Sequence, residues 1–147
     1  MRPRGQGDPD ALIDLLPHRP PALLVTEVIE HVGRTATLAG RIPHSHPYVA
    51  EGRVSALLVV DFAAQAAGVL IGLLKATETE DLPHPELGFL VGLRETRLFV
   101  PEVCVDQALE ARVRLEAQMG DLATFSFTVT LDGEEAAEGR LSLSTPA

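Results

Sequence analysis

The feature that most constrains the fold is an almost wholly apolar run over residues 56–74. It reads ALLVVDFAAQAAGVLIGLL, and only Asp61 and Gln65 in it carry polar side chains. These two residues are four positions apart, so they would share one face of a helix. A helix that is apolar on all sides must be buried, either in lipid or inside a protein. The run therefore predicts one buried helix that carries a single carboxylate.

The membrane and the protein core are the two possible surroundings of this helix. The run is long enough to be considered as a membrane span. Asp61 would then lie near its middle, at a cost of about 2.5–3.5 kcal/mol on insertion scales. The run is also rich in alanine and glycine, which let other main-chain segments approach closely. We therefore expect a core helix in a cytoplasmic protein and no membrane association.

Asp61 has a functional and a structural interpretation. A carboxylate buried without a partner is costly, and burial tends to raise the pKa of a carboxyl group. Such groups are typical of catalytic acids and bases. Alternatively, Asp61 is a structural residue that accepts hydrogen bonds from the main chain or from Gln65. The residues alone leave both interpretations open.

Composition limits the other possibilities. The chain has 147 residues, of which 46% are hydrophobic and 22% charged, a globular composition. We expect a flexible segment over residues 1–8 and a single domain over residues 9–147. The net charge of −9, without a run of Lys or Arg, argues against a nucleic-acid partner. The single Cys104 excludes an intramolecular disulfide, and no Cys/His cluster has the spacing of a zinc site.

Most of the remaining chain has the character of β-strands. Strand-like segments cover residues 22–30, 34–42, 87–93, 109–118 and 124–131. In the last three, apolar and polar residues alternate with a period of two, which is typical of half-buried strands. Asp132-Gly133 predicts a turn into a final strand that ends near Ser144. We also expect a turn over residues 31–33 and a short helix over residues 9–16.

One-sided strands of this kind are typical of an antiparallel sheet that is covered on a single face. The apolar helix is the one element that can cover it. We therefore predict an α+β protein with the hot-dog fold, in which a curved antiparallel sheet of five or six strands wraps around one long buried helix. Such a sheet has free edges, and pairing of edge strands across a two-fold axis would cover them. This predicts a dimer.

Four segments of the sequence are similar to one enzyme family: LLPHRPPALLVTEVIE, HPYVAEGRV, DFAAQAAGVL and LGFLVGLRETRLFVP. The first resembles the opening, and the third the central helix, of the bacterial 3-hydroxyacyl-[acyl-carrier-protein] dehydratases. The other two are similar to the aryl-polyene-type (ApeP-like) branch of these enzymes. The matching segments are residues 15–30, 46–54, 61–70 and 87–101. The resemblance extends over nearly the whole chain beyond residue 10.

The resemblance implies a site and a reaction. His46 matches the catalytic histidine, Asp61 the catalytic carboxylate, and Gln65 a glutamine that helps to hold the site in order. In the family, the histidine and the carboxylate of one site come from two subunits. The implied reaction removes water from a 3-hydroxyacyl thioester, with His46 as the base and Asp61 as the acid, and needs no metal or other cofactor. Main-chain N–H groups at the start of the helix, around Ser55, Ala56 and Leu57, are expected to stabilise the negative charge on the thioester oxygen.

The family pattern also leaves alternatives. In the fatty-acid branch the histidine loop reads His-Phe-Pro-Gly, whereas this chain has His46-Pro47-Tyr48-Val49, and His44 is a second candidate for the base. Arg94 is a candidate contact for the phosphate of a phosphopantetheine arm or for an acidic carrier protein, although a solvated Arg is the commoner case. The thioester carrier is either acyl carrier protein or coenzyme A.

Two other functions remain open at this point. A hot-dog thioesterase would use Asp61 to activate water. An inactive hot-dog subunit would form a heterodimer with an active dehydratase.

Overall fold

The computed structural model of the chain describes residues 13, 22–78 and 89–144. Over these residues it contains one helix and eight strands. In chain order the elements are β1 (Val25–Val32), β2 (Thr35–Gly40), β3 (Arg53–Ser55), α1 (Leu58–Glu78), β4 (Phe89–Leu98), β5 (Glu102–Cys104), β6 (Leu109–Met119), β7 (Leu122–Leu131) and β8 (Glu134–Ser144).

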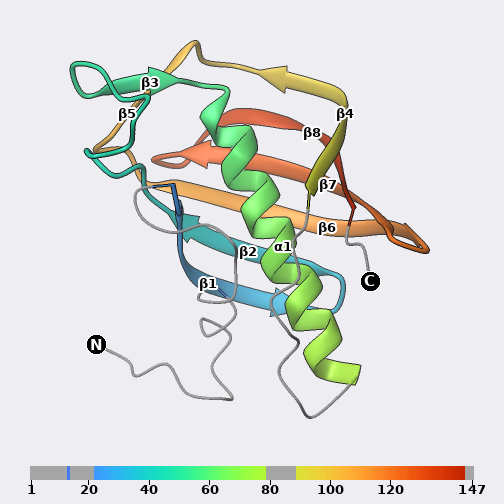
Figure 1. Cartoon of the computed structure of the whole chain (residues 1–147). Helices are drawn as coiled ribbons and strands as arrows, with labels where there is room; N and C mark the ends of the chain where they lie inside the picture. Colours follow the sequence, from blue (N-terminus) through green and yellow to red (C-terminus); the bar gives the residue numbers. More distant parts are fainter. Residues whose placement is uncertain (1–12, 14–21, 79–88, 145–147) are drawn as a thin grey trace.

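Six of the strands form one antiparallel sheet in the order β1-β2-β6-β7-β8-β4. Its edge strands are therefore β1 and β4. Figure 1 shows the sheet curving around α1, which crosses one of its faces. The predicted hot-dog fold is confirmed, with six strands in the main sheet.

The core lies between α1 and the inner face of the sheet. Along β6, buried residues alternate with exposed ones, so that Val113 and Leu115 face α1 while Arg112 and Arg114 face outward. The helix contributes Phe62, Ala66 and other fully buried residues to the same hydrophobic cluster. By length and composition α1 could span a membrane, but 67% of its apolar window is buried inside the protein. Burial of one face of each strand against one helix is what the alternation predicted.

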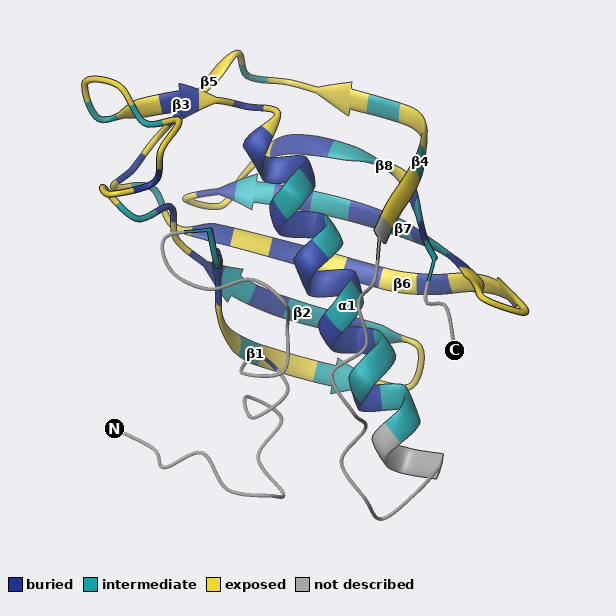
Figure 2. Cartoon of the chain, viewed as in Figure 1, coloured by how far each residue is buried: buried dark blue, intermediate teal, exposed yellow. Residues whose placement is uncertain are grey.

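One side of α1 is less covered than the rest. Asp61, Ala64, Gly68 and Gly72 are of intermediate exposure, and their spacing of three or four residues places them on one face of the helix. In Figure 2 this face is teal, whereas the rest of the helix is largely dark blue. Because three of these residues are Ala or Gly, this face can be approached closely by another chain or a ligand.

The structure differs from the prediction in several boundaries. The helix begins at Leu58, two residues after the start of the apolar run, because β3 occupies the three residues before Ala56. β3 and β5 form a second, two-stranded sheet that the sequence did not reveal. Each has only three residues, too few for an alternation to be recognised. The turn between β1 and β2 lies at Gly33 and Arg34 instead of over residues 31–33.

Two further predictions fall on the N-terminal part of the chain. The predicted flexible segment over residues 1–8 lies outside the described residues. So does the predicted helix over residues 9–16, apart from Ile13, which is buried in the core cluster.

The edge strand β4 is irregular at its middle. Arg94 pairs with Arg140 and Arg97 pairs with Glu138, so Glu95 and Thr96 stand opposite the single residue Gly139. This is a β-bulge, and Glu95 adopts a positive φ of 51° within it. A Cβ atom at position 139 would lie 2.8 Å from the Cα of Thr96, so the strands can come this close only because residue 139 is glycine. Figure 1 shows the resulting bend in β4.

Candidate active site

Gln65 joins the central helix to the start of β1. Its side-chain oxygen accepts a hydrogen bond from the main-chain N–H of Leu24 at 2.8 Å and a longer one from that of Val25 at 3.4 Å. Its side-chain nitrogen donates to the carbonyl of Ala22 at 3.0 Å and to Oδ2 of Asp61 at 3.2 Å. The side chain is only 1% exposed. A buried amide with all of its groups bonded in this way has a fixed orientation.

Asp61 lies one helical turn before Gln65, in the first turn of α1. It is of intermediate exposure, less buried than the apolar run predicted, and lies on the partly uncovered side of the helix. Its carboxylate oxygen Oδ2 accepts the hydrogen bond from the side chain of Gln65 at 3.2 Å. Asp61 is therefore held as a hydrogen-bond acceptor that a ligand on this side of α1 can reach.

His46 is buried in the loop between β2 and β3, with only 6% of its surface exposed. Its main-chain N–H donates to the carbonyl of Pro43, and its own carbonyl accepts from the N–H of Val49, both at 3.0 Å. Its ring atom Nδ1 accepts a hydrogen bond from the N–H of Tyr48 at 3.2 Å. The rings of His46 and Tyr48 also lie against each other, with their centroids 5.4 Å apart. The loop therefore holds this imidazole in one orientation.

His44, the alternative candidate for the base, has different surroundings. Its side chain is 77% exposed, and its Nε2 lies 3.6 Å from a carboxylate oxygen of Asp106, which is itself exposed. A contact between two such exposed groups contributes little to stability. His44 is thus placed as a surface residue, whereas His46 is buried.

The segment just before α1 contains Ser55 and Ala56, near which main-chain N–H groups were expected to bind the thioester oxygen. The N–H of Ala56 donates to the carbonyl of Pro101 at 3.1 Å, and the N–H of Leu57 donates to the hydroxyl of Ser55 at 3.2 Å. The N–H groups of Ala56 and Leu57, which lie where the thioester oxygen was expected to bind, therefore have partners within the chain.

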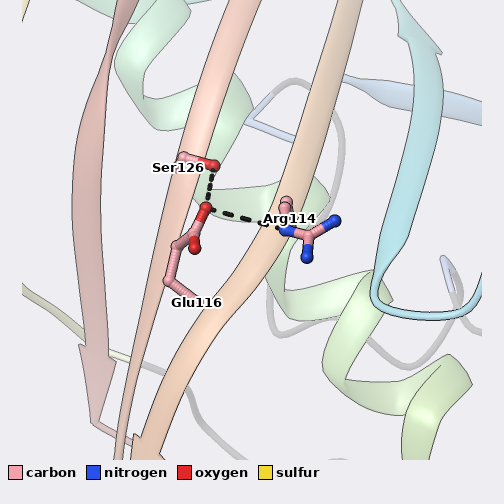
Figure 3. A network of polar contacts seen from close by, with 3 residues as sticks. All are labelled: Arg114, Glu116 and Ser126. Atoms are coloured by element: carbon pink, nitrogen blue, oxygen red, sulfur yellow. Dashed lines mark hydrogen bonds and ion pairs between the residues drawn. The ribbon is translucent and has the colours of Figure 1, made fainter.

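Arg94 lies on the opposite face of the sheet from α1. In the strand register, one row of directly opposite residues runs across the sheet from β4 to β6. It consists of Arg94, Arg140, Ser126 and Arg114. Residues directly opposite one another in a sheet share a face. Figure 3 shows Arg114 and Ser126 on this outer face, both in contact with Glu116 at 3.8 and 2.7 Å. The structure therefore places Arg94 on the outer surface rather than beside Asp61.

Sequence reasoning missed the contacts that orient the two candidate side chains. The link from Gln65 to Leu24 and Ala22 crosses about forty positions of the chain, and no local pattern reports it. The bond from Tyr48 to His46 is made by a main-chain N–H, which every residue except proline possesses. One feature of the sequence could have pointed to this bond. Pro47 has no N–H, so the first main-chain N–H after His46 is that of the second residue, Tyr48.

The arrangement offers acid–base chemistry. A half-buried carboxylate and a buried imidazole are the side chains most often used to move protons in catalysis. Among the described residues there is no group of three or more His, Cys, Asp or Glu side chains that could hold a metal ion.

Comparisons with known proteins agree with this chemistry. The family model of the ApeP-like proteins, described as ApeP dehydratase, matches residues 11–147. The chain is 29% identical over 143 residues to the 3-hydroxyacyl-[acyl-carrier-protein] dehydratase FabZ of Dechloromonas aromatica, covering 88% of this chain and 92% of that protein. It is 29% identical over 136 residues to FabZ of Haemophilus influenzae, covering 88% of each chain.

Among solved structures, the chain resembles one from the dehydratase heterocomplex ApeI:P of Xenorhabdus doucetiae. The TM-score is 0.79 at 24% identity, over 92% of this chain and 91% of that one. A hypothetical thioesterase from Streptococcus pneumoniae with coenzyme A matches at a TM-score of 0.59 and 10% identity, over 82% of this chain and 85% of that one. These two likenesses show the fold. The family model covers nearly the whole chain, and the chain therefore belongs to the ApeP-like dehydratase family.

Proposed function

We propose that the protein removes water from a 3-hydroxyacyl thioester to give the trans-2-enoyl thioester. The observation that carries the proposal is the Asp61–Gln65 pair, in which a buried amide with a fixed orientation holds a reachable carboxylate at the start of α1. The dehydratase family and the FabZ relatives agree with it. Asp61 and His46 are the two residues that exchange protons with the substrate.

The carrier of the acyl group is proposed to be an acyl carrier protein. The FabZ relatives are named as acyl-carrier-protein dehydratases. Arg94 and Arg140 lie directly opposite each other on the outer face of the sheet. Two like charges in this position repel each other, and a negatively charged partner surface would relieve the repulsion. A cytoplasmic location is proposed as well; the 67% burial of the apolar window of α1 fits a core helix rather than a membrane span.

The active form is proposed to contain a second hot-dog subunit, bound at β4. Leu90, Leu93 and Leu98 of β4 pair with Leu143, Leu141 and Ala137, which are buried on the inner face of the sheet. The three leucines share that face, yet they are 37–46% exposed. An edge strand of ten residues with an uncovered apolar row is suited to pairing with another strand.

The experiment that tests the reaction is mass spectrometry of a 3-hydroxyacyl carrier protein incubated with the purified protein. We expect the loss of one water from the acyl group. Loss of the whole acyl group would show a thioesterase instead and would contradict the proposal. The same acyl group on coenzyme A, run in parallel, separates the two possible carriers.

A second candidate function is that of a subunit in a heteromeric dehydratase. The uncovered row of leucines on β4 favours it, and the similar chain from Xenorhabdus doucetiae belongs to a heterocomplex. In that case the purified protein alone leaves the substrate unchanged, and water is lost only after a second hot-dog subunit is added. No change under either condition would contradict both candidates.

A further inference from the structure

The outer face of the sheet, on the side away from α1, carries its charged side chains in three parallel rows. Each row consists of residues that stand directly opposite one another on neighbouring strands and therefore share this face. Successive rows are two residues apart along β6, which is a distance of about 7 Å. We call them the acidic row, the mixed row and the basic row.

The first and the last of these rows carry opposite charges. The acidic row has three glutamates and no cation, and it consists of Glu27, Ala39, Glu110, Thr130 and Glu135. The mixed row has two residues of each charge, and it consists of Glu30, Thr37, Arg112, Thr128, Glu138 and Arg97. The basic row has three arginines and no carboxylate, and it consists of Val32, Thr35, Arg114, Ser126, Arg140 and Arg94. All charged residues of the acidic and basic rows are exposed.

These charges are only partly neutralised within the chain. Glu116 lies beside the basic row, and its carboxylate is 3.8 Å from Nε of Arg114 (Figure 3). In the part of the chain that the structure describes, no ion pair is formed by Glu110, Glu135 or Arg140. The acidic and basic rows therefore present charges that a partner of complementary pattern can neutralise.

We propose that this face packs against the same face of a second copy of the chain, about a two-fold axis that runs along the mixed row. Rotation about this axis places each strand over its own copy and exchanges the acidic row with the basic row. On β6, Glu110 then faces Arg114 of the second copy, and on β8, Glu135 faces Arg140 of the second copy. Because such a contact is isologous, each ion pair occurs twice. This contact is separate from the proposed reaction and from the contact at β4.

The strand between β6 and β8 allows two sheets to approach closely. From residue 124 to residue 130, the side chains of β7 on the outer face are all hydroxyls: Thr124, Ser126, Thr128 and Thr130. Packed sheets lie about 10 Å apart, and short side chains at the centre of a contact permit this spacing. Because the sheet curves around α1 (Figure 1), its outer face is convex, so β6, β7 and β8 make the contact and the edge strands turn away from it.

The size of this contact makes it sensitive to salt. β6, β7 and β8 have ten or eleven residues each, so their outer face measures about 15 Å by 35 Å, or on the order of 500 Å² for each copy. A stable interface typically buries about 800 Å² of each partner. A smaller contact that is made by exposed charges is weak and is screened by salt. We therefore expect the contact at low salt, and only the contact at β4 at high salt.

Arg112 provides a control on the same face. It lies in the mixed row, near the axis, where it faces its own copy. Arg112→Glu changes the net charge as much as Arg140→Glu does, but it replaces one pair of like charges by another. The association should therefore be kept in Arg112→Glu and lost in Arg140→Glu, where two carboxylates face each other.

Sedimentation velocity of the full-length protein at low and at high salt tests the proposal. The wild type is measured beside Leu93→Lys, which is designed to remove the contact at β4 and so isolates the outer face. We expect Leu93→Lys to have twice the mass at low salt that it has at high salt, because an isologous contact closes at two copies. In this background, Arg140→Glu and Glu135→Arg should each abolish the doubling. The two substitutions combined in one chain should restore it, since opposite charges then face each other again.

Masses that do not change with salt, in the wild type and in Leu93→Lys alike, would overturn the proposal. So would a combined variant that does not regain the doubling although its circular dichroism spectrum equals that of the wild type. If the mass is independent of salt and Arg140→Glu instead weakens the binding of an acidic acyl carrier protein, the face binds that protein rather than a second copy.

Discussion

At the scale of single residues, Gln65 makes more of the hydrogen bonds that order the candidate site than its position in an apolar run suggests. It is buried, and it satisfies main-chain groups of Leu24 and Ala22 as well as the carboxylate of Asp61. An isolated polar group buried at this depth would be destabilising. The same contacts fix the start of β1 against α1, so one side chain links the core to the candidate site.

Replacing Gln65 by leucine keeps the approximate volume and removes every one of these hydrogen bonds. The N–H of Leu24 and the carbonyl of Ala22 are then left without their partner, and we expect a loss of about 2–4 kcal/mol in the free energy of unfolding. Urea denaturation measures it. Gln118→Leu on the exposed part of β6 is the matched control and should change stability by about 0.5 kcal/mol or less. Equal effects of the two variants would contradict the role given to Gln65.

At the scale of elements, the bend of β4 depends on a single glycine in the neighbouring strand. A methyl group at position 139 would meet the main chain of Thr96 at 2.8 Å, and main chain cannot rotate away as a side chain can. Gly92 in β4 offers a contrast, because its nearest neighbour, the Cβ of Ser142, is 3.9 Å from where a methyl group would lie.

We therefore expect Gly139→Ala to lower the stability by about 1–3 kcal/mol and Gly92→Ala to be tolerated. Thermal unfolding of both variants beside the wild type provides the measurement. Tolerance of Gly139→Ala equal to that of Gly92→Ala would show that the bulge is not fixed by this contact.

The elements also show what the sequence can and cannot reveal. The central helix and the strands β6 and β7 were predicted because long apolar or alternating runs report burial directly, and β8 was predicted because Asp132-Gly133 indicates a turn. β3 and β5 were missed because pairs of three-residue strands are held by tertiary contacts. For the candidate site, Asp61 and Gln65 stood out as the two polar residues of the apolar run, and His46 came from the family resemblance. Their hydrogen bonds involve main-chain groups of Tyr48, Leu24 and Ala22, which a sequence does not distinguish from any others.

At the scale of the whole molecule, the uncovered leucines of β4 predict assembly. Leu93→Lys places a charge in the middle of this row, and we expect it to shift the protein from dimer to monomer because a buried charge without a partner is costly. Light scattering coupled to size-exclusion chromatography measures the mass. Leu122→Lys at the start of β7 is the control, because Leu122 lies outside the β4 row and is 43% exposed, close to the 46% of Leu93. A wild type that is monomeric alone and with a second hot-dog subunit would contradict the role of β4.

We propose that dehydration depends on His46 and Asp61, brought together from two subunits as the family resemblance implies. It is tested most directly by mixing two inactive variants, His46→Leu and Asp61→Asn, under conditions in which subunits exchange. A mixed dimer has one site that lacks both residues and one that is intact. Because random mixing makes half of the dimers mixed, we predict recovery of about a quarter of the wild-type rate. No recovery, although native mass spectrometry shows mixed dimers, would contradict a shared site, and wild-type rates in either single variant would contradict its catalytic role.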